Sequence, residues 1–186
     1  MPRRRENAAP TARTPTSERE PLDDLFAATY HELRHIASSL KRHDGSVTLN
    51  PTALVNEAWL RMSDSPQLGA LSRAHFKAVA ARAMRRVLID AARRRNARKR
   101  AGNDTVVIAF DESTEQRIAR DDDVLGLDAA LQDLARLDPR QASLVEYRYF
   151  GGLTVSELAE TLGVSETTVE RDWRVAKAWL KSQLSR

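Results

Sequence analysis

Residues 31–35 (HELRH) match the H-E-x-x-H pattern, in which two histidines one helical turn apart bind zinc and the glutamate acts as general base. Asn56-Glu57 further along the chain could supply a third ligand. Leu33, however, belongs to the apolar stripe of the predicted helix. His31 and His35 are each two positions from Leu33, which places them about 200° around the helix from it. His31 and His35 therefore point away from the core, and no strand-rich region precedes the helix to form a substrate cleft. A zinc metallopeptidase is thus a remote alternative, and we predict no metal site and no catalytic residue.

A second set of residues is strongly basic. Residues 93–100 (RRRNARKR) place six cations in eight positions, and Arg82, Arg85 and Arg86 extend this charge upstream along the same predicted helix. The simplest reading is a solvated helix end, which the helix dipole favours. Because the whole chain carries a net charge of only +4, such local density favours a polyanionic partner. We interpret this helix as a nucleic-acid contact.

A third set, residues 154–169 (TVSELAETLGVSETTV), is typical of a helix-turn-helix. Ala159 supplies the small residue where the two helices meet, and Gly163 the left-handed turn. Thr154 forms a capping box with Glu157, and Ser165 caps the second helix. The outward face of that helix carries Glu166, Thr167, Thr168, Glu170, Arg171, Arg174 and, further along, Lys181. Hydroxyls and guanidinium groups in this arrangement reach base edges and phosphates in a major groove, although a helical hairpin that docks on a protein partner is the alternative.

The composition indicates which elements position these residues. The chain of 186 residues is 41% hydrophobic and only 5% aromatic, and it has seven glycines and seven prolines, which favours helices over a β-sandwich. It contains no cysteine, which excludes disulfides, thiolate metal sites and cysteine nucleophiles. No apolar run approaches the ~20 residues that span a bilayer, and the N-terminus lacks a signal-peptide core. We therefore expect a cytoplasmic protein that does not contact a membrane.

Apolar spacing divides the chain into an all-α protein of two small helical domains joined by an acidic flexible linker. Residues 1–20 predict a disordered tail. Residues 21–101 form the first, three-helix domain, with helices predicted from Pro21 to Leu40, over 51–62 and over 73–100. Residues 102–123, rich in Asp and Glu, form the linker. Residues 124–186 form the second domain, with helices predicted over 124–137, 140–150, 154–162 and 165–184.

The order of an Arg-rich three-helix domain, a linker and a helix-turn-helix resembles the sigma factors of the extracytoplasmic-function (ECF, group IV) class. Residues 54–61 (LVNEAWLR) look like the region 2.2 helix that docks on the RNA polymerase clamp, and residues 76–95 look like regions 2.3 and 2.4. Region 4 is matched by four segments: 138–141 (DPRQ), 146–150 (EYRYF), 152–159 (GLTVSELA) and 168–174 (TVERDWR). The resemblance covers about residues 21–184. Ala53, Arg86 and Glu170 depart from it, since many members carry Asp, Asn and Lys there.

The resemblance implies a factor that binds core RNA polymerase and directs promoter recognition, melting and transcription initiation without a cofactor. Core polymerase binding is assigned to Asn56, Glu57, Trp59, Leu60 and Arg61. Contact with the minus-ten element is assigned to Arg82, Arg85, Arg86, Arg93 and Arg94, with a flipped base captured in the loop 63–75. Contact with the minus-35 element is assigned to Ser165, Thr167, Thr168, Arg171 and Arg174. The linker would run toward the RNA exit channel.

The partners implied are therefore core RNA polymerase and promoter DNA, and the resemblance leaves room for an anti-sigma or other regulatory protein. A free-standing helix-turn-helix transcriptional regulator is the alternative function. Such a regulator would share the C-terminal unit, but it would need neither the clamp-like helix nor the Arg-rich N-terminal domain.

Overall fold

The computed structural model describes residues 16–41, 50–99 and 121–184, and these form helices only, which confirms the all-α prediction. The elements are α1 (Thr16–Lys41), α2 (Pro51–Met62), the short 3₁₀ helix η1 (Pro66–Ala70), α3 (Arg73–Lys99), α4 (Asp121–Leu137), α5 (Pro139–Gly151), α6 (Val155–Leu162) and α7 (Glu166–Leu184). The predicted tail up to residue 15 and the predicted linker up to residue 120 lie outside the described residues.

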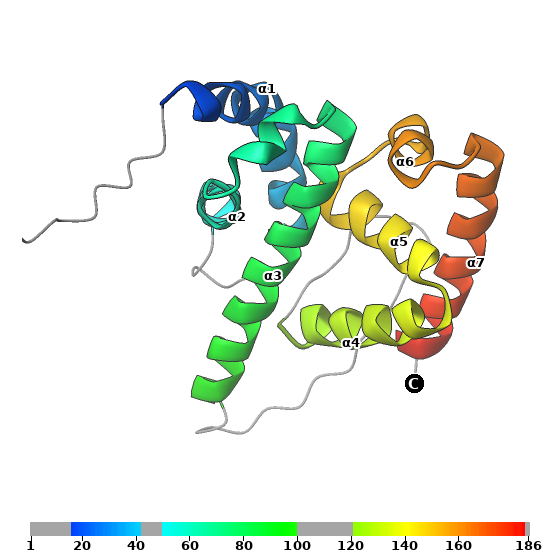
Figure 1. Cartoon of the computed structure of the whole chain (residues 1–186). Helices are drawn as coiled ribbons and strands as arrows, with labels where there is room; N and C mark the ends of the chain where they lie inside the picture. The colour runs from blue at the N-terminus through cyan, green and yellow to red at the C-terminus, as the bar shows by residue number, and fades with distance from the viewer. Residues whose placement is uncertain (1–15, 42–49, 100–120, 185–186) are drawn as a thin grey trace, which may run out of the picture.

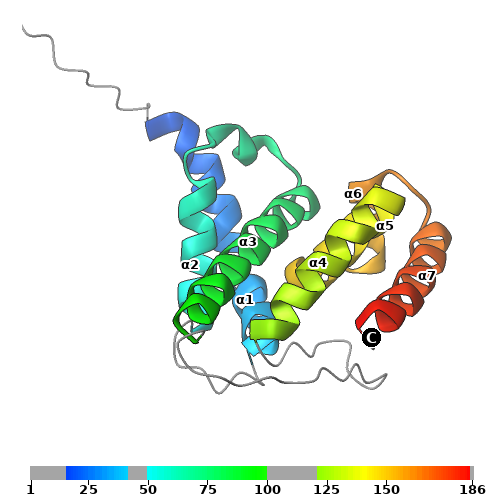
Figure 2. The ribbon, with the colours of Figure 1, turned by 90° about the horizontal axis from the view of Figure 1, so that it is seen from below.

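The long helix α3 lies in the middle of the molecule. Figures 1 and 2 show α1 and α2 on one side of it and α4 and α5 on the other, with α6 and α7 beyond. Phe76 and Met84 of α3 are fully buried, and one continuous apolar core extends from Leu22 of α1 to Leu180 of α7. The N-terminal half (α1, α2, η1 and α3) and the C-terminal half (α4–α7) therefore pack directly on each other.

The helix α2 has the bounds that its sequence predicts. Asn50 caps it, since its side-chain oxygen accepts a hydrogen bond from the Ala53 N–H at 2.6 Å, and Pro51 occupies the first turn, where no N–H is needed. Its predicted apolar face is buried, and that face consists of Leu54, Val55, Ala58 and Met62.

The start of α1 differs from the prediction. We expected Pro21 to open the helix, but the helix begins at Thr16 and Pro21 lies inside it, so residues 16–20 of the predicted tail are helical. Gly69 of η1 packs tightly here, because a Cβ atom on it would lie 2.9 Å from the Leu22 nitrogen and 3.2 Å from the Pro21 Cβ. Pro21 removes one backbone hydrogen bond from the helix, and η1 packs closely against the same turn.

Local capping signals set the helix boundaries of the C-terminal half. Asp138 caps α5 by accepting hydrogen bonds from the N–H groups of Arg140 and Gln141, and Gly152 ends α5 in the left-handed conformation. α4 begins at Asp121, three residues before the predicted start at Val124.

Candidate nucleic-acid interface

The helices α6 and α7 form the predicted helix-turn-helix. Thr154 and Glu157 make both hydrogen bonds of the capping box, so α6 begins where the sequence indicates. Gly163 ends α6 with φ of 65°, and a Cβ atom there would meet nothing within 4 Å, so the backbone angle alone requires glycine. Leu158 and Val169 are fully buried between the two helices.

The outward face of α7 carries the residues that the sequence assigns to minus-35 DNA. Thr167, Arg171 and Arg174 are exposed, and the Arg171 side chain retains 64% of its accessible surface. Ser165 caps the helix, because its hydroxyl accepts the Thr168 N–H at 3.2 Å and lies 2.9 Å from the Thr168 hydroxyl. These two hydroxyls are therefore engaged with each other, which leaves Thr167 as the free hydroxyl of this first turn.

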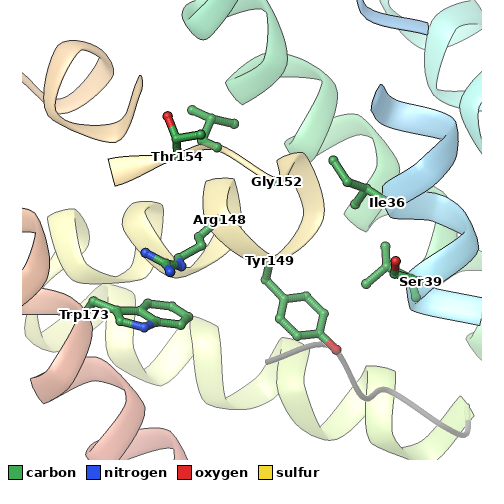
Figure 3. Close-up of a pocket in the computed structure, with 9 residues that line it drawn as sticks. Ile36, Ser39, Arg148, Tyr149, Gly152, Thr154 and Trp173 are labelled. Carbon is green, nitrogen blue, oxygen red and sulfur yellow. The ribbon is translucent and has the colours of Figure 1, made fainter. Parts of the chain in front are cut away.

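Two contacts fix the orientation of α7 against α5. Asp172 is buried on the inner face of α7 and accepts hydrogen bonds from the Arg140 guanidinium at 2.9 Å. The guanidinium of Arg148 lies over the Trp173 ring (Figure 3), 4.6 Å from the ring centroid. Within α7, the Lys177 ammonium lies 5.6 Å from the same centroid. A cavity of about 230 Å³ adjoins this stack, and its opposite wall comes from α1, including Ile36 and Ser39. The inner face of α7 is thus held against α5 by these contacts.

The cations of α3 have different surroundings. Arg86 and Arg94 are exposed, and the side chains of Arg82 and Arg93 retain 51% and 63% of their accessible surface. Arg85 retains only 16%. The side chains of residues 98–100 lie outside the described residues.

Arg85 is covered by two helices of the C-terminal half. Its Nη2 and Nε lie 2.6 and 3.1 Å from the Asp128 carboxylate on α4, and its Nη1 lies 3.0 Å from Glu146 on α5. Neighbouring cations share these partners, since Arg82 lies 3.8 Å from Glu146 and also donates a hydrogen bond to the Tyr147 hydroxyl. Arg93 lies 3.7 Å from Asp128. The predicted minus-ten residues are thus brought together along α3, with Arg85 fully engaged in ion pairs.

Lys77 is a buried cation that the sequence reading missed. Its ammonium group lies 2.7 and 2.9 Å from the two Glu157 oxygens on α6 and 3.2 Å from Glu32 on α1, and only 4% of its side chain is exposed. Burial would raise the pKa of Glu157, but the hydrogen bonds and charge of Lys77, together with the hydrogen bonds from Thr154, outweigh it and lower the pKa. One signal in the sequence could have indicated this buried cation: a lone lysine stands between Phe76 and Ala78, in an otherwise apolar part of α3.

Most of the α2 residues assigned to core polymerase are exposed, and two of the five contact neighbouring helices. Asn56, Glu57 and Leu60 are exposed, and Leu60 keeps 62% of its surface although it is a large apolar residue. Arg61 pairs with Asp90 of α3 at 2.9 Å. Trp59 is half-buried and stacks on Phe26 of α1, with ring centroids 4.2 Å apart.

The HELRH segment lies on α1 with both histidines exposed, as its apolar spacing predicts. Glu32, which would be the general base of a zinc peptidase, instead forms ion pairs with Arg73 and Lys77. Among the described residues no group of three or more His, Cys, Asp or Glu side chains could hold a metal ion. No described helix has the length and apolar character needed to cross a bilayer.

The described residues form an all-helical protein with a C-terminal helix-turn-helix and an Arg-rich helix before it, an organisation typical of DNA-binding proteins. A family model described as ECF sigma factor matches residues 17–186, and the chain therefore belongs to the ECF sigma factor family. The protein is a sigma factor of transcription initiation, a family of initiation factors rather than enzymes. Comparison with curated proteins and with solved structures found no match. The family match includes both halves, which favours a sigma factor over a free-standing regulator.

Proposed function

We propose that the protein binds core RNA polymerase through α2, contacts the minus-ten element through α3 and reads the minus-35 element through α7. The observation that carries this proposal is that α7 is capped and anchored to α5 by its inner face, while Thr167, Arg171 and Arg174 are exposed. Side chains at the start of a recognition helix reach base edges, and guanidinium groups bind guanine or phosphate. Ser165 and Thr168 complete this set by fixing the helix N-terminus.

Core polymerase is the partner proposed for the exposed face of α2. An exposed leucine flanked by polar residues is typical of a protein contact, and here Leu60 lies beside Asn56, Glu57 and Arg61. Trp59 is half-buried next to this face, and its ring stacks on the Phe26 ring of α1. An anti-sigma or other regulatory protein remains a prediction of the family resemblance.

Promoter melting is proposed for the N-terminal half. Positive charge lies along α3 at four exposed positions, Arg82, Arg86, Arg93 and Arg94. Arg85 would add to this charge if its ion pairs with α4 and α5 were broken. The segment 63–75, which contains η1 and the first residues of α3, would receive a flipped minus-ten base. Flipping costs a few kcal/mol, which contacts in the pocket must offset, so melting would draw on binding energy and not on ATP.

The proposed functional units are residues 21–101 for core polymerase and the minus-ten element, and residues 124–186 for the minus-35 element. Residues 102–123 would connect them along the path toward the RNA exit channel. Both helical units have their own buried apolar residues, such as Val55 and Phe76 in the first and Leu158 and Val169 in the second.

Transcription in vitro with core polymerase and genomic promoter fragments tests this proposal. We expect promoter-specific transcripts with the wild type and a loss of about tenfold or more on minus-35-dependent promoters with Arg174→Ala, since a base or phosphate contact contributes about 1–3 kcal/mol. Arg136→Ala on α4 is the matched control, because Arg136 is also exposed and, within the described part of the chain, pairs with Asp133 of its own helix. Transcription that stays absent with every promoter fragment refutes the sigma factor role at this site. Equal activity of Arg174→Ala and Arg136→Ala refutes the placement of α7 in the groove.

A further inference from the structure

We propose that Glu170 of α7 selects a cytosine in the minus-35 element, with its carboxylate accepting a hydrogen bond from the amino group of that base. Glu170 would thus be a specificity-determining residue, in addition to the five residues already assigned to this element. The assignment rests on the proposed function, because Glu170 reaches a base only if α7 enters the major groove.

Glu170 lies on the same exposed side of α7 as the proposed DNA contacts. Figures 1 and 2 show α7 at the outer edge of the molecule. Glu170 is the fifth residue of this helix; it follows Thr167 by three positions and precedes Arg174 by four, and all three residues are exposed. Residues at these spacings are neighbours on a helix surface. Since the first residues of a recognition helix are the ones that contact base edges, Glu170 lies where bases are read.

Local structure accounts for the other carboxylates of the helix-turn-helix. Two of them pair with cations, a third accepts a hydrogen bond from a serine, and a fourth lies in the first turn of α7, where the helix dipole favours negative charge. These are Glu157, Asp172, Glu160 and Glu166, in that order. Glu170 lies beyond the first turn, and within the described part of the chain no hydrogen bond or ion pair engages its carboxylate. The carboxylate is therefore available to a ligand on the outer surface of α7.

The chemistry of the major groove limits which base can face a carboxylate. Phosphates repel it, and guanine and thymine present acceptor oxygens on this edge. Only the N4 group of cytosine and the N6 group of adenine donate hydrogen bonds there. The adenine amino group stands beside the N7 acceptor, which would repel the second carboxylate oxygen, whereas cytosine presents a donor without an acceptor. Cytosine is therefore the base that Glu170 fits.

Arg174 favours the same assignment from the next turn of α7. Its guanidinium group is exposed and lies on the same side of the helix as Glu170. The positive charge lowers the cost of bringing a carboxylate close to phosphates. Guanine, the partner of cytosine, presents the O6 and N7 acceptors that a guanidinium group binds. An acid and an arginine one turn apart thus match a site that contains both cytosine and guanine.

Glu170→Gln is the variant that tests the assignment. Glutamine keeps the size of the side chain, but its amide both donates and accepts, which suits the N6 and N7 groups of adenine. Glu170→Ala removes the contact without replacing it. Asp133→Asn on α4 is the control, because it also removes one negative charge from an exposed side chain, and Asp133 pairs with Arg136 within its own helix.

The full-length proteins are each assembled with core RNA polymerase and used to select duplexes. The wild type first selects from genomic fragments, and the upstream element of the most enriched fragment is then randomised for selection by all four proteins. We expect the wild type and Asp133→Asn to enrich cytosine at one position about tenfold over guanine and thymine. Glu170→Gln should enrich adenine at that position, and Glu170→Ala should show no preference there. The bases selected at the other positions should be the same for all four proteins.

An unchanged base preference in Glu170→Gln and Glu170→Ala overturns the assignment. It does so even if both variants bind more tightly, since the loss of one negative charge strengthens binding to all sequences alike. A change of preference at a position where the wild type selects a base other than cytosine overturns it as well. Failure of the proposed function is a different result, in which the wild type with core polymerase enriches no fragment, and the assignment then falls with it.

Discussion

The ion pair between Lys77 and Glu157 joins the two halves and allows a quantitative prediction. We consider Lys77→Met, Glu157→Gln and the double variant. Methionine keeps the length of a side chain that is 96% buried, since 4% is exposed. Glutamine at the third position of α6 can still bond back to the Thr154 N–H, so the capping box survives while the charge is removed.

The expected coupling free energy follows from the geometry. A hydrogen bond to a charged group contributes about 1.5–3 kcal/mol, and breaking a fully buried pair by removing one partner costs about 3–5 kcal/mol. Glu157 keeps 24% of its side chain exposed, so water partly solvates it when Lys77 is absent. The coupling should therefore lie near the lower of these ranges, at about 2 kcal/mol.

The pH dependence provides a second check. The pKa of Glu157 is lowered in the folded protein, so its ionised form stabilises the fold above the ordinary pKa of glutamate. That contribution is lost as the pH falls through this ordinary value and on through the lowered folded pKa. The coupling should thus be complete at neutral pH and absent once Glu157 is protonated.

Urea unfolding of the four proteins, followed by circular dichroism, gives the double-mutant cycle at each pH. Tryptophan fluorescence follows both halves, since Trp59 lies in the first and Trp173 and Trp179 in the second. A coupling below about 0.5 kcal/mol at neutral pH, the range of exposed pairs, would refute the reasoning. A coupling free energy that stays unchanged in acid would also refute this reasoning.

Three further predictions concern the site. Leu60→Ala should weaken binding to core polymerase in a pull-down by tenfold or more while the free energy of unfolding changes by less than about 0.5 kcal/mol, since the side chain is exposed. Leu137→Ala, an exposed leucine on α4, is its control, and equal effects would contradict the assignment of α2. Gly163→Ala should lower the free energy of unfolding by about 1–2 kcal/mol through its left-handed angle alone, and an unchanged melting temperature would contradict this. Asp172→Ala should cost about 1–3 kcal/mol in urea unfolding and weaken minus-35 DNA binding, because Arg140 loses its buried partner. Unchanged stability would show that Asp172 does not anchor α7.

Local signals in the sequence determined the elements of this protein. The caps at Asn50, Asp138 and Thr154 and the left-handed Gly163 each act within a few residues, so reading them needs no knowledge of the fold. The apolar face of α2 was predicted from spacing, and the helix-turn-helix from its caps, Ala159 and Gly163; the structure confirms both elements. The predicted start of α1 was wrong, because the helix continues back through Pro21 to Thr16 and Gly69 of η1 packs against it there.

Only the tertiary structure decided what surrounds α3. Its sequence shows one apolar face toward α1 and α2, but Ala78 and Ala81 are also buried, and alanine gives little indication of burial in a sequence. These small side chains allow the C-terminal half to approach so closely that Arg85 and Lys77 meet carboxylates far along the chain. Whether a cation faces solvent, DNA or a carboxylate depends on which surfaces come together, and that is a non-local property. The Arg-rich helix was thus identified from sequence, whereas the pairing of Arg85 with Asp128 and Glu146 was not.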